Sequence, residues 1–78
     1  MYYTYILKLS NKDYYTGSTS NLKQRVKDHQ EGNNISTKPF RPLKLVYYCA
    51  FSTKSQAIKF EMYLKSGSGN AFRNRHLV

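Results

Sequence analysis

The N-terminal segment constrains the fold most, because it has the pattern of a β-hairpin. Residues Tyr2–Leu9 are mostly aromatic, aliphatic or β-branched and alternate between two faces, which is typical of a strand. Ser10–Asp13 has the composition of a turn, and Tyr14–Gly17 resumes the strand pattern. We therefore predict an antiparallel hairpin at the start of the chain.

A helix and a third strand are predicted next. Ser18–Asn21 is rich in residues that cap helix N-termini, so we expect a helix that runs to about Glu31. Gly32 ends that helix, and residues 33–43 form a polar loop. Residues 43–51 are mostly apolar on both faces, so we expect a strand that is central in the sheet or well covered.

The last third of the chain is predicted to be helical. Ser52–Ser55 caps a second helix that runs to about Lys65, Ser66–Gly69 interrupts it, and Asn70–Arg75 forms a short third helical segment. The order β-β-α-β-α-α predicts an α+β fold, in which helices flank a small, mostly antiparallel three-stranded sheet.

Length and cysteine content limit how such a fold is stabilised. The 78 residues suffice for a single domain, residues 1–78. Cys49 is the only cysteine, so no internal disulfide forms, and with His29 and His76 it is too few ligands for a four-ligand zinc site. Packing of the 8 Tyr and 4 Phe must therefore supply much of the stability.

The net charge indicates the kind of partner. Lys and Arg number 13 against 4 Asp and Glu, a net charge of +9, which favours a polyanion. Nucleic acid is the first candidate for the partner, and an anionic membrane surface is the second. Alternatively, the chain is a basic structural protein of a ribonucleoprotein. The longest apolar run, Leu45–Phe51, is far shorter than the ~20 residues of a membrane span. With no signal-peptide pattern either, we expect a reducing, cytoplasmic location.

Polar residues lie on the apolar stripe of the first predicted helix. Leu22, Arg25, Val26 and His29 follow the spacing that places residues on one helix face. Two interpretations stay open. The Arg25 and His29 side chains flank the stripe and reach water, or they face a phosphate group and take part in phosphoryl chemistry.

A carboxylate lies on the apolar stripe of the second predicted helix. Glu61 shares that stripe with Ala57, Ile58 and Leu64. A carboxylate among apolar neighbours needs a partner. Glu61 either pairs with Arg25 or binds a hard divalent cation such as magnesium, which often takes one or two protein carboxylates.

Most of the eight tyrosines are expected to pack in the core or at the surface. A phenol becomes chemically active only where a nearby cation lowers its pKa from about 10, and Lys8, Lys23 and Arg25 are candidates for that role. A basic chain rich in aromatic residues could also stack single-stranded bases.

These residues together resemble the motifs of the GIY-YIG nucleases. Tyr3–Tyr5 and Tyr15–Gly17 resemble the two signature strands, and Gly17–His29 resembles the following helix with its Arg and His. Ala57–Lys65 resembles the second helix with its metal-binding Glu, and Leu64–Gly69 is similar to the ending of small stand-alone bacterial members. The resemblance covers essentially the whole chain.

The resemblance implies hydrolysis of a phosphodiester bond with one divalent metal ion, Mg²⁺ or Mn²⁺. Tyr5 and Tyr15 would be the two signature tyrosines, one of which deprotonates or positions the attacking water. Arg25 would stabilise charge on the phosphate, His29 would assist proton transfer, and Glu61 would hold the metal.

Some positions depart from the family pattern. Tyr3 and Thr4 stand where Gly and Ile are usual, and Ser18 stands where some relatives carry Lys. Asn70 or Asn74 could take the place of a late Asn that some members carry near the metal. The departures motivate an alternative function, a nucleic-acid-binding module of the same fold that has lost catalysis.

The hairpin register carries a testable condition. Tyr5 and Tyr15 reach one site only if they face the same side, which requires directly opposed residues whose numbers add to an even sum, such as Leu7 with Tyr15. We therefore predict a hairpin loop with an odd number of residues, or a bulge.

The sequence thus predicts a metal-dependent DNA endonuclease that is structure-selective or weakly specific, with single-stranded or branched DNA as substrate. No separate recognition module is expected, no feature specifies the oligomeric state, and membrane binding is the least favoured partner class. Seven cationic residues are candidate phosphate contacts: Lys8, Lys23, Lys27, Lys38, Arg41, Arg73 and Arg75.

Overall fold

Three antiparallel strands form the sheet, and the first strand of the chain lies in its middle. In the computed structural model, which describes residues 1–78, β1 (Tyr2–Lys8) pairs with β2 (Tyr14–Thr19) on one side and with β3 (Lys44–Phe51) on the other. The element order is β-β-α-β-α-α, so the predicted α+β fold is confirmed.

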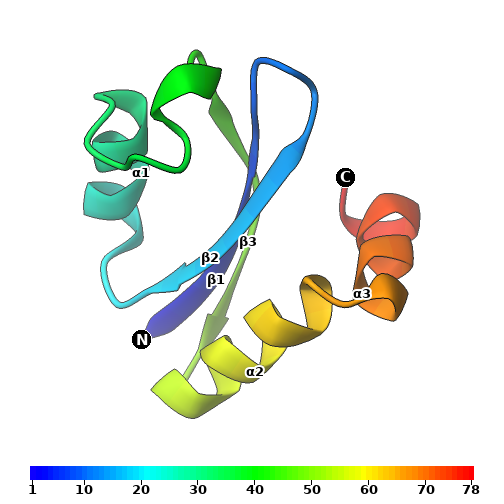
Figure 1. Ribbon diagram of the computed structural model, residues 1–78. Helices are drawn as coiled ribbons and strands as arrows, with labels where there is room; N and C mark the ends of the chain where they lie inside the picture. The colour runs from blue at the N-terminus through cyan, green and yellow to red at the C-terminus, as the bar shows by residue number, and fades with distance from the viewer.

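Helices cover the two faces of this sheet (Figure 1). α1 (Leu22–Gln30) lies on one face, whereas α2 (Lys54–Leu64) and α3 (Gly67–Phe72) lie on the other, followed by a π-helical turn at Arg73–Leu77. A 3₁₀ turn, Lys38–Phe40, precedes β3. None of the helices has both the length and the apolar character needed to cross a bilayer.

The predicted helix starts follow from side-chain caps. The Asn21 side chain accepts a hydrogen bond from the backbone N–H of Gln24 at 3.1 Å, and the Thr53 hydroxyl accepts one from that of Gln56 at 3.2 Å. Each bond satisfies a donor that the first helical turn leaves free, and this fixes where α1 and α2 begin.

The hairpin register is the one that the two signature tyrosines require. Leu7 lies opposite Tyr15, and Tyr5 lies opposite Gly17. The loop between the strands contains residues 9–13, an odd number, as predicted. Tyr5 and Tyr15 therefore face the same side of the sheet, which is the side covered by α1.

The main apolar core lies between the sheet and α1. Its buried members are Tyr5, Leu7, Leu9 and Leu43, and the half-buried residues around them are Tyr15, Leu22, Val26, Phe40 and Leu45. On the opposite face of β1, Ile6 is fully buried, and the Thr4 hydroxyl donates to the backbone carbonyl of Ala57 in α2 at 2.7 Å. Both faces of β1 are thus covered.

Two element predictions are wrong. The third strand is neither central nor well covered, because β3 lies at the edge of the sheet and none of its residues is fully buried. The third helical segment does not begin at Asn70. α3 begins at Gly67, since the Ser66 side chain caps it by accepting from the N–H of Gly69 at 3.1 Å.

Candidate active site

Tyr5 lies at the centre of the candidate site, under α1 and fully buried. Its ring extends across Gly17 on the neighbouring strand. A Cβ atom on Gly17 would lie 2.5 Å from the Tyr5 hydroxyl oxygen, closer than real Cβ contacts occur. The absence of a side chain at Gly17 is therefore what lets the phenol occupy this position.

The imidazole of His29 is held between two hydroxyl groups. His29 lies near the end of α1 and is fully buried. The Tyr5 hydroxyl is 2.9 Å from its Nε2, and the Thr37 hydroxyl is 2.7 Å from its Nδ1. Thr37 comes from the loop after α1 and is itself fully buried. No sequence pattern indicates Thr37, since the loop around it is mostly polar in composition.

Burial sets the protonation states of the Tyr5–His29 pair. Burial raises the pKa of Tyr5 to about 12, and the nearby Arg25 guanidinium only partly opposes this rise. Burial also lowers the pKa of His29 below its usual 6.5, and the Arg25 charge adds to that effect. At neutral pH the phenol therefore keeps its proton and the imidazole is neutral, so one of its ring nitrogens donates a hydrogen bond and the other accepts one.

Tyr15 packs beside this pair but is less enclosed. Its ring centroid is 5.1 Å from that of His29 and 6.5 Å from that of Tyr5. Tyr15 is only half-buried, whereas Tyr5 is fully buried. Of the two signature tyrosines, Tyr15 is thus the one whose side chain reaches solvent.

Arg25 lies at the edge of the sheet beside β2. Of the two interpretations open for Arg25 and His29, Arg25 fits the one in which the side chain reaches water, because Arg25 is exposed whereas His29 is fully buried. Arg25 lines a cleft of about 520 Å³ together with Ser18 and Thr19 of β2, and α2 contributes Lys54 and Ala57. The guanidinium is therefore accessible to a ligand that enters between α1 and α2.

Glu61 reaches the same edge from α2. Its side chain is 18% exposed. The Ser18 hydroxyl donates to Oε1 at 2.7 Å, and the Lys65 ammonium lies 2.7 Å from Oε2. The predicted alternative of a Glu61–Arg25 ion pair is wrong, because the partner is Lys65. The i,i+4 spacing of Glu61 and Lys65 is the sequence signal that identifies this pair.

The donor set around Glu61 fits magnesium. No group of three or more His, Cys, Asp or Glu side chains gathers anywhere in the chain, so a fully protein-ligated metal site is absent. Mg²⁺ instead takes one or two carboxylates and completes its octahedron with water and substrate phosphate. Glu61 supplies one such carboxylate, and the neutral Ser18 hydroxyl beside it is a further hard oxygen donor.

The remaining predicted residues lie outside this group. No hydrogen bond joins Asn70 or Asn74 to the five predicted catalytic side chains, and Asn74 instead accepts from Arg73 Nε at 3.1 Å. Lys8 and Arg73 lie over the ring of Tyr14, at 5.9 Å and 4.8 Å from its centroid.

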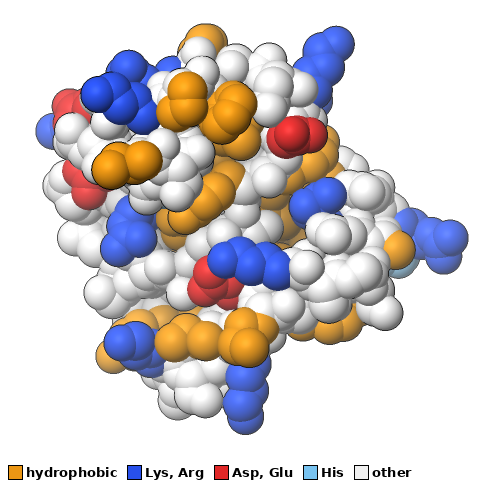
Figure 2. Space-filling model, in the orientation of Figure 1, with side chains coloured by type: hydrophobic (Ala, Val, Ile, Leu, Met, Phe, Trp, Pro, Cys, Tyr) orange, Lys and Arg blue, Asp and Glu red, His pale blue; other side chains and the backbone are white.

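The other five predicted phosphate contacts are exposed: Lys23, Lys27, Lys38, Arg41 and Arg75. Figure 2 shows that Lys and Arg side chains are scattered over the visible face rather than gathered into one patch. The cations of this face are therefore distributed, which suits attraction of a polyanion more than recognition of one fixed shape.

Comparison with known proteins identifies the family. The GIY-YIG catalytic domain matches residues 1–75 of this chain. The UPF0213 protein CPE1444 of Clostridium perfringens is 41% identical over 71 residues, which is 90% of this chain and 76% of that protein. The UPF0213 protein SH2523 of Staphylococcus haemolyticus is 40% identical over 68 residues, which is 86% of this chain and 83% of that protein.

A solved structure agrees with this similarity. The solution NMR structure of the UPF0213 protein BH0048 from Bacillus halodurans matches with a TM-score of 0.60 and 31% identity, covering 96% of this chain and 82% of that one. The chain has a nuclease fold, and it belongs to the GIY-YIG family, with small bacterial UPF0213 proteins among its relatives. The resemblance drawn from the sequence motifs is confirmed.

Proposed function

We propose that this protein is a metal-dependent endonuclease that hydrolyses phosphodiester bonds in DNA. One observation carries the proposal. Ser18 lines the cleft that contains Arg25, and the same Ser18 hydroxyl holds the Glu61 carboxylate at 2.7 Å. A cation for the phosphate and a carboxylate for a metal ion thus come from different helices to the same edge of β2.

Arg25 is the residue that contacts the scissile phosphate in this proposal. Its guanidinium is accessible in the cleft and offers two parallel N–H groups to phosphate oxygens. Charge on these oxygens increases as the attacking water approaches phosphorus, so the attraction to Arg25 is strongest in the transition state.

Tyr15 is the tyrosine that contacts the attacking water. Tyr5 is fully buried, and its pKa of about 12 keeps it protonated, so it is poorly suited to accept a proton from solvent. Tyr5 and His29 instead pack against the Tyr15 ring and hold it in place.

Glu61 would hold the metal ion, with Ser18 beside it. A bound divalent cation supplies positive charge that neutralises the phosphate and the leaving oxygen. The Lys65 ammonium forms an ion pair with Oε2 of Glu61. Because the Lys65 side chain is 54% exposed, it can rotate toward solvent when a divalent cation binds the carboxylate.

The proposed substrate is single-stranded or branched DNA, cut with little sequence preference. The cations are spread over several elements rather than gathered on one of them. Binding through distributed Lys and Arg depends on phosphates and weakens steeply with added salt.

One observation favours a second candidate, a nucleic-acid-binding module without catalysis. The Glu61–Lys65 ion pair neutralises the only carboxylate of the site, so the site is electrostatically satisfied without a metal ion. In that case the protein binds DNA through the same cations but does not cut it.

A nuclease assay separates the two functions. Labelled single-stranded, branched and duplex DNA are incubated with the protein in the presence of Mg²⁺, Mn²⁺ or a chelator. We expect cleavage of the single-stranded or branched DNA with metal and none with the chelator. Binding of the same DNA without cleavage under any metal condition would support the binding module instead.

A further inference from the structure

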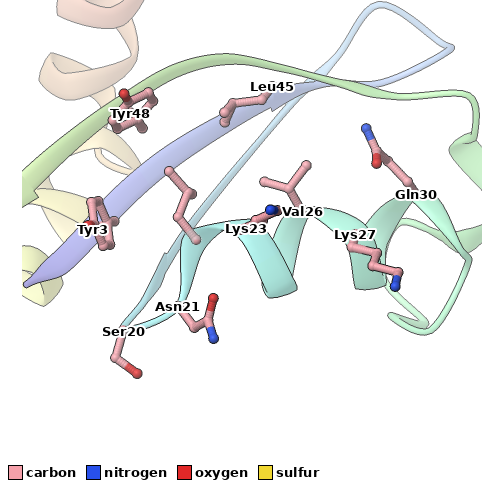
Figure 3. Close-up of a pocket in the computed structure, with 10 residues that line it drawn as sticks. Tyr3, Ser20, Asn21, Lys23, Val26, Lys27, Gln30, Leu45 and Tyr48 are labelled. Carbon is pink, nitrogen blue, oxygen red and sulfur yellow. The ribbon is translucent and has the colours of Figure 1, made fainter.

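A second depression lies on the α1 side of the sheet, next to the cleft. This base groove, as we name it, has a volume of about 710 Å³ and opens between α1 and the strands β1 and β3. Tyr3 and Tyr48 stand at one end, and Leu45 and Val26 face each other across it (Figure 3). Its volume lies in the usual range for sites that hold small ring systems, ~300–1,000 Å³.

The groove is exposed because β3 is an edge strand. Tyr48 is 55% exposed although it lies beside the fully buried Tyr5 in the sheet register. Its ring makes an edge contact with that of Tyr3, with centroids 6.3 Å apart. Tyr3 thus supports the Tyr48 ring edge-on at the surface, where a flat ligand can stack on the exposed face of Tyr48.

The chemistry of the groove is complementary to a nucleotide. Leu22, Val26 and Leu45 supply an apolar wall, and Lys23 and Lys27 supply cations along α1, while no Asp or Glu lines the groove. Aromatic rings bind bases by stacking, and neighbouring lysines bind the phosphates between those bases. Asn21 and Gln30 add amide groups that can bond to base edges.

The groove also adjoins the cleft of the candidate active site. Ser20, which directly follows β2, lines both depressions. A DNA strand with one phosphate beside Arg25 can therefore pass over Ser20 and place a neighbouring base in the groove. Paired bases are stacked inside a duplex and cannot enter, so the groove selects unpaired ones.

We propose that the base groove binds an unpaired base of single-stranded DNA, stacked on the exposed ring of Tyr48, which Tyr3 supports edge-on. This inference rests on the proposed function for its choice of DNA as ligand, and it assigns the feature of the substrate that the site recognises. Because it concerns binding, it is testable without cleavage.

The test is a binding measurement in the presence of a chelator. The anisotropy of a labelled single-stranded oligonucleotide is followed with the wild-type protein and with the variants Tyr48→Ala, Tyr48→Phe and Tyr63→Ala. Tyr63 is the matched control, because it is a tyrosine of similar exposure, 43%, that lies on α2. A second oligonucleotide carries abasic positions and so offers phosphates without bases.

We expect Tyr48→Ala to weaken binding of the intact oligonucleotide at least about fivefold, whereas Tyr48→Phe and Tyr63→Ala bind as the wild type does. The abasic oligonucleotide should bind the wild type more weakly, with no further loss in Tyr48→Ala. Equal wild-type affinity for the intact and abasic strands would overturn the proposal.

Two further outcomes bear on the inference. A dimer in light scattering that Tyr48→Ala dissociates would show that a second copy fills the groove, and would overturn the proposal. Tyr48-dependent binding by a protein that never cleaves DNA would support the base groove and contradict the nuclease function. Failure of the groove proposal and failure of the proposed function therefore give different results.

Discussion

The Tyr5 hydroxyl is hydrogen-bonded to Nε2 of His29 across 2.9 Å, and both side chains are fully buried. The bond joins the central strand to α1. On the other side of the imidazole, Nδ1 is hydrogen-bonded to the Thr37 hydroxyl at 2.7 Å. Buried polar atoms of this kind are costly to leave unpaired. The pair therefore stabilises the fold at the same time as it supports the candidate site.

Removal of the Tyr5 hydroxyl should destabilise the protein. In Tyr5→Phe the buried Nε2 of His29 loses its partner, and we expect the free energy of unfolding to fall by ~1–3 kcal/mol. Urea denaturation measures this change. Tyr63→Phe, in which the altered side chain is 43% exposed, should leave the stability unchanged within ~0.5 kcal/mol. Equal stability of Tyr5→Phe and the wild type would show that the bond contributes nothing.

The stability of the protein should fall as the solution is acidified through the titration of His29. Burial lowers the pKa of His29 from 6.5, so below about pH 6.5 the imidazole binds a proton in the unfolded chain but stays neutral in the folded one. The free energy of unfolding then decreases by up to ~1.4 kcal/mol for each pH unit until the folded-state pKa is reached. Denaturation at a series of pH values measures this slope. It should disappear in His29→Gln and persist in His76→Gln, because His76 is exposed.

An added methyl group at position 17 should disturb the site. In Gly17→Ala the new Cβ lies 2.5 Å from the Tyr5 hydroxyl oxygen, so the phenol must move. We expect a loss of ~1–3 kcal/mol in unfolding free energy, together with reduced nuclease activity. Gly67→Ala is the control, since nothing lies within 4 Å of a Cβ at that position. A Gly17→Ala protein as stable and active as Gly67→Ala would contradict the placement of Tyr5.

Removal of the Lys65 ammonium should strengthen metal binding. Lys65 competes with a metal ion for Oε2 of Glu61, and an exposed pair of this kind contributes ~0.2–1 kcal/mol. In Lys65→Met we expect the magnesium concentration for half-maximal cleavage to fall up to about fivefold. Lys59→Met alters another exposed lysine of α2 and should leave it unchanged. An unaltered magnesium requirement in Lys65→Met would argue against Glu61 as the metal ligand.

The fold was largely predictable from local patterns, because the starts of α1 and α2 and the hairpin loop depend on neighbouring residues. The position of β3 was not, since its apolar character on both faces fits a central strand equally well. The central position belongs to β1, where Thr4 is buried because a backbone carbonyl of α2 accepts its hydroxyl proton. A hydrogen bond to a residue so far along the chain cannot be predicted from the spacing of residues.

The candidate site was predictable in its charged members and less so in their surroundings. His29 and Glu61 stand out as polar residues on apolar stripes. Thr37 does not, because a threonine in a polar loop is ordinary until the loop folds over His29. The exposure of Tyr48 likewise depends on β3 being an edge strand, so the base groove becomes evident only in the structure.

The central claim is that Glu61 belongs to a metal-dependent nuclease site, and a pair of charge-matched variants tests it most directly. The rate of cleavage of single-stranded DNA in Mg²⁺ is compared for wild type, Glu61→Gln and Glu31→Gln, where Glu31 is exposed at the end of α1. Both variants remove one negative charge. We predict a loss of at least ~100-fold in Glu61→Gln and a wild-type rate in Glu31→Gln. Cleavage by Glu61→Gln at the wild-type rate would contradict the account.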